Sequence, residues 1–236
     1  MARIDIAGAG PAGLAAAIVL ARAGREVRVH ERRRTVGERF GGDYQGIENW
    51  STREDAMVEL ERAGIEPGFD HYAFDRTYIT DTTRTRCFRL PRTSYYLVRR
   101  GPYPGSLDRA LERQARELGV QIHLESRLAP ERADIVATGV LSRRVPGQVH
   151  GIAFDTDSSD VAVVVCNDQL AWKGYSYLLV ADGQGCLCTV VLGELARTRT
   201  CFTATRAYFE DEWGVDIQAP RPVGGGGQLC PRHRLR

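Results

Sequence analysis

The chain opens with a pattern of apolar and polar positions that predicts a strand, a helix and a second strand. Residues 4–7 alternate with the period of two that is typical of a strand, and residues 26–30 do the same. Between them, residues 14–23 are apolar on nearly every side, and the following Gly24 suits the left-handed position after a helix. This order predicts a β–α–β unit with two parallel strands.

Helical and strand patterns alternate in the middle of the chain. One predicted helix has Ser51 or Thr52 near its N-cap, and a second, strongly amphipathic one is followed by Gly119. We expect the strands after the second helix to resume the parallel sheet, and the strands before it to pair as an antiparallel excursion. The predicted helices span residues 49–64 and 107–118, and the predicted strands span residues 72–79, 85–90, 95–98, 120–124 and 134–139.

Beyond residue 141 the period of two dominates, as in an antiparallel meander separated by Asp, Ser and Gly turns. The strands are predicted over residues 149–154, 161–166, 175–180 and 187–192, and a helix over residues 195–213. The aromatic residues between Trp172 and Tyr177 could wall an apolar pocket or belong to the core. Residues 220–236 combine a run of glycines with prolines, which predicts irregular structure.

The segment G-A-G-P-A-G, residues 8–13, joins the first strand to the first helix. Gly8 suits a tight turn, Gly10 lets the backbone approach a pyrophosphate, and Gly13 permits close packing of the helix on the strand. Pro11 and Ala12 fall in the first helical turn, where free N–H groups and the helix dipole favour phosphates. This arrangement predicts a dinucleotide site.

An acidic residue, Glu31, ends the second strand, where it can accept hydrogen bonds from ribose hydroxyls. A carboxylate there disfavours a 2′-phosphate, so NADP is not expected at this site. The fingerprint alone leaves FAD and NAD open. The polar, glycine-rich residues 36–43 that follow could lie against a long cofactor or form a solvated loop.

Composition and charge argue against several classes of function. Lys+Arg 32 against Asp+Glu 30 gives a net charge of +2, which argues against a nucleic-acid partner. No apolar run is long enough to span a membrane, and no signal peptide precedes the first strand, so a cytoplasmic protein is expected. The six cysteines form no C-x-x-C pair, and we expect reduced thiols and no metal site.

The order of motifs resembles the FAD-dependent geranylgeranyl reductase-like proteins of the flavin hydroxylase-like superfamily. The glycine fingerprint followed by Glu31 and Arg32 looks like their FAD site, and Val98 to Leu107 resembles a V-x-R-x-x-F segment in which Arg100 meets the flavin end. Residues 133–139 resemble a segment that packs beside FAD, and residues 173–183 resemble the G-Y-x-W strand and turn of a substrate sheet. The resemblance covers nearly the whole chain.

The resemblance implies an α/β fold, in which a Rossmann-type FAD-binding domain is interleaved with an antiparallel β-sheet substrate domain. The expected FAD-binding domain comprises residues 1–42 and 95–144, the substrate domain residues 43–94 and 145–219, and the irregular tail residues 220–236. The expected FAD-binding residues are Gly8, Gly10, Pro11, Ala12, Gly13, Glu31, Arg32, Arg39, Arg100, Thr138 and Gly139. No catalytic acid or base is assigned.

The implied activity is the reduction of an apolar, prenyl-like small molecule or lipid by hydride from reduced FAD. NAD(P)H or ferredoxin would supply the electrons, and a peripheral contact with a membrane is compatible with such a substrate. Two departures limit the resemblance. The family's distal G-D-A-A-G segment is missing, which predicts a truncated chain, and Arg39-Phe40-Gly41-Gly42 stands where the reductases often have Cys-Gly.

Three alternatives remain open from the sequence. A flavin monooxygenase would share the fold, although such enzymes usually have Asp-Gly where Thr138-Gly139 stands. A truncated, non-catalytic flavoprotein fragment would explain the missing distal segment. An NAD-dependent dehydrogenase would use the same glycine fingerprint.

Overall fold

A computed structural model describes residues 3–139 and 146–227, which divide into two compact units. Unit 1 contains residues 1–73 and 95–141, and unit 2 contains residues 74–94 and 142–236. The mixed α/β architecture of a Rossmann-type protein with antiparallel sheets is confirmed. None of the helices in the described ranges is long and apolar enough to cross a bilayer.

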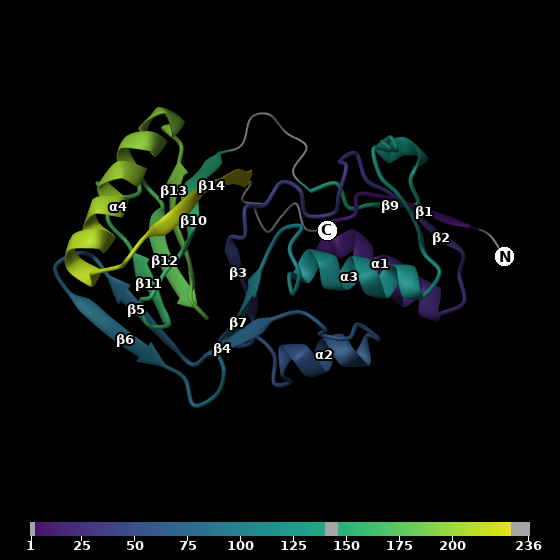
Figure 1. Ribbon diagram of the computed structural model, residues 1–236, viewed down its shortest axis with the longest axis horizontal. Helices are drawn as coiled ribbons and strands as arrows, with labels where there is room; N and C mark the ends of the chain where they lie inside the picture. Colours follow the sequence, from purple (N-terminus) through teal and green to yellow (C-terminus); the bar gives the residue numbers. More distant parts are fainter. Residues whose placement is uncertain (1–2, 140–145, 228–236) are drawn as a thin grey trace. The chain divides into compact units, whose positions relative to one another are not determined.

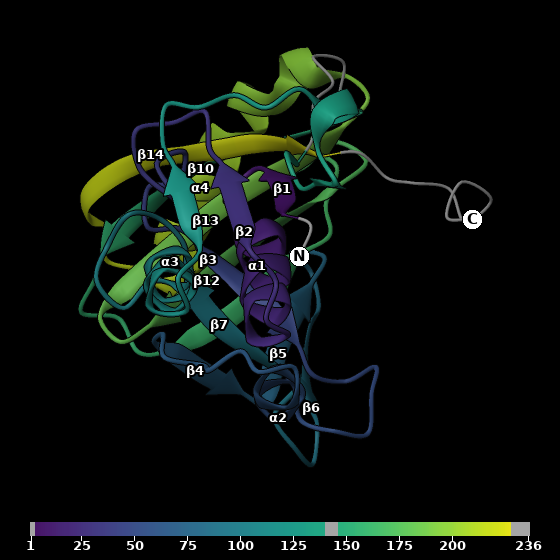
Figure 2. The ribbon, with the colours of Figure 1, turned by 90° about the vertical axis from the view of Figure 1, so that its right-hand side faces the viewer.

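Unit 1 is built on a four-stranded parallel sheet in the order β8-β2-β1-β9. The strands are β1 (Ile4–Ala7), β2 (Val27–His30), β8 (Gln121–His123) and β9 (Ile135–Val136). Helices α1 (Pro11–Arg22) and α3 (Leu107–Glu117) lie side by side (Figures 1 and 2) and share an apolar core with the strands, which includes Leu14, Val29 and Leu111. The predicted β–α–β unit and its two additional parallel strands are therefore confirmed.

A second, three-stranded sheet in unit 1 has the order β3-β7-β4. It consists of β3 (Tyr44–Glu48), β7 (Tyr95–Arg99) and β4 (His71–Phe74), and Met57 of the short helix α2 (Ala56–Arg62) packs with Val98 of β7. The 3-10 turn η1 (Pro130–Arg132) lies between β8 and β9 in the chain. The sequence pattern does not predict β3, because its central Gly46 and polar neighbours break the alternation. The prediction of one strand over residues 72–79 was wrong, since β4 and β5 (Arg76–Thr80) belong to different sheets.

The first predicted helix is shorter than expected. It begins after Asp55, whose side chain accepts a hydrogen bond from the Met57 N–H at 2.9 Å, and not near Ser51 or Thr52. Asn49 stabilises this start by accepting a hydrogen bond from the Ala56 N–H and donating one to Asp55. The Asp55 cap, supported by the buried Asn49, therefore sets the helix start in place of Ser51 or Thr52.

Unit 2 contains a seven-stranded sheet in the order β14-β10-β13-β12-β11-β5-β6. All neighbours are antiparallel except β11 and β5. The helix α4 (Thr198–Trp213), preceded by the 3-10 turn η2 (Leu195–Arg197), packs its buried Phe209 on one face of this sheet with Phe154 and Leu187. The strands are β5 (Arg76–Thr80), β6 (Thr85–Arg89), β10 (Gly147–Asp155), β11 (Val161–Val165), β12 (Tyr175–Ala181), β13 (Gln184–Leu192) and β14 (Gln218–Gly227).

The strand β14 corrects the prediction of irregular structure from residue 220. It pairs with β10 at the edge of the sheet, where Pro222 is tolerated because a strand edge needs no donor on its outer side. Gly224 approaches β10 so closely that a Cβ would lie 2.8 Å from the Val149 carbonyl oxygen. The glycine run thus permits tight pairing here, and residues 228–236 of the predicted tail lie outside the described residues.

Two cysteines lie close together on one strand of the meander. Cys186 and Cys188 point to the same side of β13, with their sulfur atoms 3.5 Å apart, and both are buried. Neither forms a disulfide with a residue that the structure describes.

Candidate functional site

The glycine turn between β1 and α1 is held by close backbone contacts. Gly8 has a φ of +103°, and a Cβ there would lie 2.4 Å from the Ala137 carbonyl oxygen. A Cβ on Gly13 would lie 2.0 Å from the Gly8 carbonyl oxygen. These two glycines are therefore required for packing, as the fingerprint predicts.

Gly10 differs from both of these glycines. Its φ of −76° suits any residue, and a Cβ there would meet nothing within 4 Å. Gly10 precedes Pro11, the first residue of α1, and no side chain in the described ranges caps this helix start. The first-turn N–H groups of an α-helix have no partner within the helix, so those of Ala12 and Gly13 are available to an acceptor.

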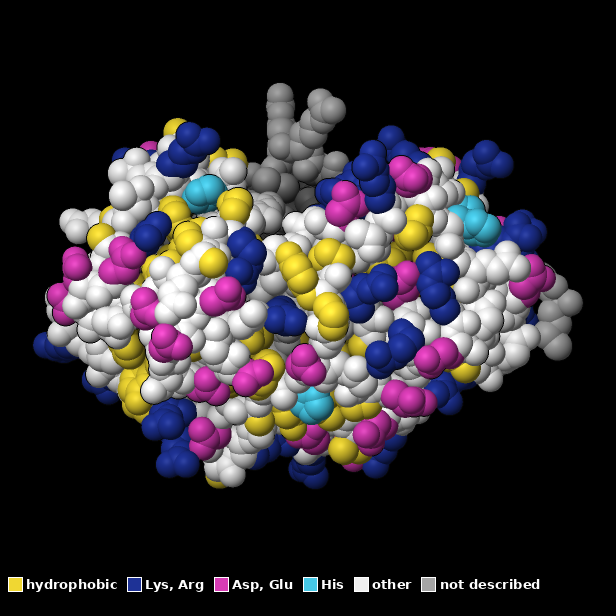
Figure 3. Space-filling view, in the orientation of Figure 1, with side chains coloured by type: hydrophobic (Ala, Val, Ile, Leu, Met, Phe, Trp, Pro, Cys, Tyr) yellow, Lys and Arg dark blue, Asp and Glu magenta, His cyan; other side chains and the backbone are white. Residues whose placement is uncertain are grey.

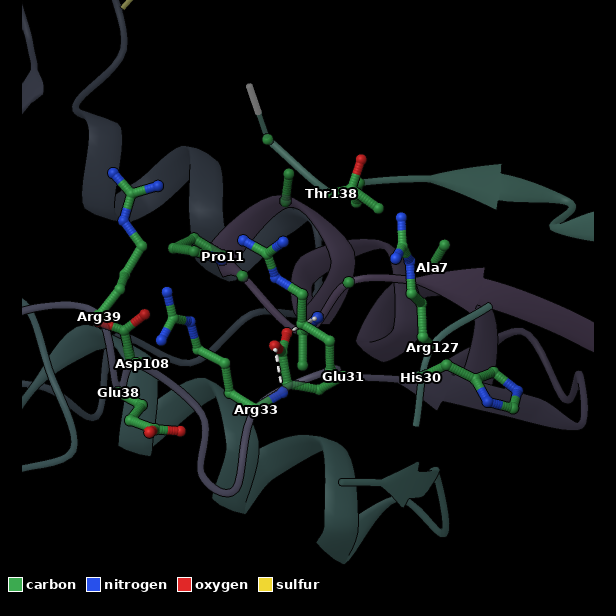
Figure 4. Close-up of a pocket in the computed structure, with 18 of the residues that line it drawn as sticks. Ala7, Pro11, His30, Glu31, Arg33, Glu38, Arg39, Asp108, Arg127 and Thr138 are labelled. Atoms are coloured by element: carbon green, nitrogen blue, oxygen red, sulfur yellow. Dashed lines mark hydrogen bonds between the residues drawn. The ribbon is translucent and has the colours of Figure 1, made fainter. Parts of the chain in front are cut away.

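Glu31 connects the end of β2 to this turn. One carboxylate oxygen accepts a hydrogen bond from the Ala9 N–H at 3.0 Å, and the other accepts one from the Arg33 N–H at 3.0 Å. Figure 4 shows Glu31 in the middle of the pocket, with Arg33 and Arg39 to one side and Arg127 to the other. The two backbone bonds fix the carboxylate, and each oxygen retains a lone pair for a ligand.

The segment after β8 supplies a wall that the sequence analysis did not identify. The Glu31 N–H donates to the His123 carbonyl at 2.9 Å, and the Ser126 N–H donates to the Glu31 carbonyl at 2.8 Å. His30 also lies 2.9 Å from the Ser126 hydroxyl through Nδ1, which holds Arg127 beside the pocket. The general rule that ligands bind beyond the carboxyl ends of parallel strands could have indicated this segment.

Arg100 is part of a buried network. Its guanidinium donates to both carboxylate oxygens of Asp108, at 2.8 and 2.9 Å, and lies over the Phe40 ring at 4.0 Å. Asp108 also accepts a hydrogen bond from the Gly101 N–H at 2.9 Å. Asp108 and Phe40 were not among the expected site residues, because only folding brings them to Arg100.

Asp43 also lies near Arg100, but its carboxyl group is less well stabilised than that of Asp108. Burial raises the pKa of its carboxyl, although Arg100 and Arg39 nearby oppose this shift. One carboxylate oxygen is buried and has no hydrogen-bond partner among the described residues. The loop that follows the pocket-lining residues 37–40 therefore contains a carboxyl group whose ionised form is poorly stabilised.

These elements surround a pocket of about 470 Å³ within unit 1. Of the expected site residues, only Gly13 is not part of its lining, since it packs beneath the turn. Five arginines and three carboxylates line the pocket, which gives it a positive balance. The expected residues in the lining are Gly8, Gly10, Pro11, Ala12, Glu31, Arg32, Arg39, Arg100, Thr138 and Gly139.

Solved structures with a similar fold include proteins described as FAD-dependent or flavin-dependent. A geranylgeranyl bacteriochlorophyll reductase-like protein from Thermoplasma acidophilum matches 95% of this chain and 66% of its own, with 14% identity and a TM-score of 0.68. The probable FAD-dependent monooxygenase pqsL from Pseudomonas aeruginosa matches 83% of this chain and 62% of its own, with 17% identity and a TM-score of 0.57. The flavin-dependent brominase Bmp2 matches 95% of this chain and 67% of its own, with 14% identity and a TM-score of 0.64.

At these identities the likeness establishes the fold alone. The chain spans about two thirds of the length of each of these proteins. A comparison with curated protein sequences gave no match. The resemblance to the geranylgeranyl reductase-like proteins therefore holds as a distant structural similarity, which a monooxygenase and a brominase share.

The family of the chain is shown by a sequence model of a protein family, which the similarity in fold alone does not show. The model described as an FAD binding domain matches residues 1–150, which include all the residues that line the pocket. The chain therefore belongs to the FAD-binding-domain family, and its cofactor is FAD.

Proposed function

We propose that the pocket of unit 1 holds FAD for an oxidoreductase reaction on an apolar substrate. The observation that carries this proposal is the open space at Gly10, between the uncapped start of α1 and the fixed Glu31 carboxylate. A pyrophosphate placed there would meet free N–H groups and the positive end of the helix dipole. The pocket's positive balance matches the two negative charges of the FAD pyrophosphate.

The expected site residues then divide into two groups. Gly8, Gly10, Pro11, Ala12, Gly13, Glu31 and Arg32 would bind the ADP half, with Glu31 directed at the ribose hydroxyls. Arg39, Arg100, Thr138 and Gly139 would lie nearer the phosphates or the flavin. Because Arg100 is already paired with Asp108, its proposed role is to shape the pocket wall through Phe40 as well as to contribute charge.

Unit 2 would provide the substrate surface. Ser176 of β12 faces α4, since its hydroxyl lies 2.8 Å from that of Thr205. Alternation along the strand therefore places Tyr175 and Tyr177 on the opposite face, where their rings lie 6.2 Å apart and Tyr175 is 45% exposed. An aromatic face of this kind suits an apolar substrate.

We propose reduction of a prenyl-like double bond, with NAD(P)H or ferredoxin as the external electron donor. Bound FAD supplies hydride transfer in such a reaction, and the chain's own residues orient the cofactor and exclude water. Hydroxylation is the second candidate, because a monooxygenase is among the proteins of similar fold. Product masses distinguish the two, since saturation adds two hydrogen atoms and hydroxylation adds one oxygen atom.

The binding proposal is tested by Gly10→Val. The substitution should leave the fold intact, because the side chain meets no protein atom, and should abolish flavin retention by filling the pyrophosphate space. Flavin absorbance after desalting measures retention, and circular dichroism measures folding. Gly46→Val on β3 is the matched control, since Gly46 is exposed and a Cβ there has only a 3.7 Å contact with Tyr95.

Flavin content equal to wild type in Gly10→Val would contradict the placement of the pyrophosphate. Loss of flavin in Gly46→Val as well would indicate general destabilisation and would remove the support for a specific site at Gly10.

A further inference from the structure

The hairpin of β5 and β6 is the most exposed part of unit 2. All residues from 81 to 90 are exposed, and β6 is the outer strand of the seven-stranded sheet. Such an edge normally carries charged residues and few large apolar ones. The β5–β6 hairpin carries exposed charged residues and also large exposed apolar ones.

Three large apolar side chains lie open on the hairpin. Phe88 is 53% exposed, Leu90 is 40% exposed and Ile79 is 37% exposed. Thr77 pairs with Phe88 and Ile79 pairs with Arg86, so Ile79 and Phe88 share one face of the hairpin. Tyr78 points the other way, with its ring 5.5 Å from that of Trp213 in α4. The apolar residues therefore lie on the face away from α4.

The same hairpin is strongly cationic. Five arginines and two aspartates lie between residues 75 and 92, in a chain with a net charge of only +2. Arg89 forms an ion pair with Asp75 at 2.8 Å, whereas Arg84 and Arg86 form no ion pair with any residue that the structure describes. In Figure 3, basic and hydrophobic side chains lie close together over the hairpin, at the lower left.

The turn of the hairpin is fixed by Asp81. Its Oδ1 accepts hydrogen bonds from the N–H groups of Thr83 and Arg84 and from the Thr83 hydroxyl, at 2.7 to 2.8 Å. These bonds lower the pKa of Asp81 to about 2, so the carboxylate remains ionised at neutral pH. Because these bonds fix the backbone at Thr83 and Arg84, the turn has little backbone entropy left to lose on binding.

We propose that the β5–β6 hairpin docks on the surface of an anionic lipid bilayer. The unpaired guanidinium groups of Arg84 and Arg86 would meet the lipid phosphates, and the apolar side chains of Ile79, Phe88 and Leu90 would enter the boundary between headgroups and acyl chains. The hairpin is outside the nucleotide pocket, so this inference does not depend on the proposed function.

A lipid surface suits the hairpin better than a nucleic acid or a protein. Ile79 and Leu90 are aliphatic and cannot stack on bases, and the net charge of +2 is low for a nucleic-acid protein. A protein strand added to β6 would have to approach three exposed arginines on that edge. The combination of charge and aliphatic side chains complements an anionic bilayer.

Co-sedimentation of the full chain with vesicles tests the proposal. We expect binding to phosphatidylcholine vesicles that contain phosphatidylglycerol at about 0.15 M salt, and release at about 1 M salt. Phosphatidylcholine alone should not retain the protein. Arg84→Ala with Arg86→Ala should weaken binding by roughly fivefold for each arginine. Phe88→Ala should weaken it by about tenfold.

Matched variants control for charge and for apolar surface. Arg199→Ala with Arg206→Ala removes two arginines from α4, and Val58→Ala trims an exposed apolar residue of α2. Neither should change vesicle binding. Flavin content and thermal unfolding of each variant report folding separately, and the hairpin variants should match wild type in both.

The proposal is overturned if the wild-type chain does not sediment with the anionic vesicles, or if the two arginine pairs lower binding equally. Binding to single-stranded RNA without binding to vesicles would assign the hairpin to nucleic acid and would also overturn it. If the wild-type chain retains no flavin after desalting, the proposed function is contradicted, but the vesicle-binding result still stands.

Discussion

Each unit of the molecule contains a buried polar network that involves a helix, and these two networks differ in chemistry. In unit 1, Arg100 and Asp108 form an ion pair with side-chain exposures of 8% and 1%. In unit 2, the hydroxyl groups of Ser176, Thr189 and Thr205 lie within 2.8 to 3.2 Å of one another. Thr205 also donates to the Leu170 carbonyl at 2.9 Å.

The two networks should respond differently when one of their side chains is removed. A buried charge without its partner retains a large desolvation cost, whereas a buried hydroxyl can redirect its hydrogen bond to a neighbour. The charged network lies beside the pocket, where exact placement of Phe40 and Gly101 matters to the wall. The neutral network lies between α4 and the sheet, where it contributes mainly to stability.

The largest expected effect is that of Asp108→Ala. Removing the carboxylate leaves the buried Arg100 guanidinium without its ion-pair partner and with Gln45 Oε1 as its remaining side-chain acceptor, so we expect a loss of about 3–5 kcal/mol in the free energy of unfolding. Urea denaturation measures this loss. Asp211→Ala on the exposed side of α4 is the control and should change stability little.

A double substitution sharpens this result. Arg100→Met with Asp108→Leu removes both charges, and should be less destabilising than Asp108→Ala alone. If the double variant is the less stable of the two, the buried charge is not the reason for the loss, and packing around Phe40 would be the better explanation.

Thr205→Val should have a smaller effect. The substitution keeps the side-chain volume and removes one hydroxyl, after which Ser176 can still donate to the Leu170 carbonyl at 3.2 Å. We expect a loss of about 1–2 kcal/mol, measured by urea denaturation. Thr203→Val is matched on the same helix, where the exposed hydroxyl donates only to the Arg199 carbonyl. A loss as large as that of Asp108→Ala would mean that the neutral network is as sensitive as the charged one.

The sequence predicted local chemistry well and contacts between distant segments poorly. Gly8, Gly10 and Glu31 could be recognised because a turn, a helix start and a strand end occur at fixed spacing in one β–α–β unit. Ser126 and Asp108 could not, since they reach the pocket only through the pairing of β8 with β2 and the packing of α3. The strand β14 was missed because glycine and proline lower strand propensity, while its pairing at the sheet edge tolerates both.

The smallest effect, and the most informative about the pocket, is expected for Asp43→Asn. Asp43 and Asp108 lie near the same arginine, but Asp108 is paired through both oxygens, whereas one oxygen of Asp43 is buried without a partner. Since burial raises the pKa of Asp43 above 3.8, its ionised form destabilises the folded chain as pH rises through the folded pKa. Asp43→Asn removes that charge and should raise the melting temperature at neutral pH.

The pH dependence distinguishes this cause from a change in packing. Below the ordinary carboxyl pKa of 3.8, Asp43 is protonated in both the folded and the unfolded chain, so the gain from Asp43→Asn should disappear there. Melting temperatures measured across this range, with Asp211→Asn as an exposed control, provide the comparison. A gain in melting temperature that persists at low pH would show that the amide packs better than the acid. A lower melting temperature at neutral pH would show that Arg39 and Arg100 stabilise the Asp43 carboxylate more than burial destabilises it.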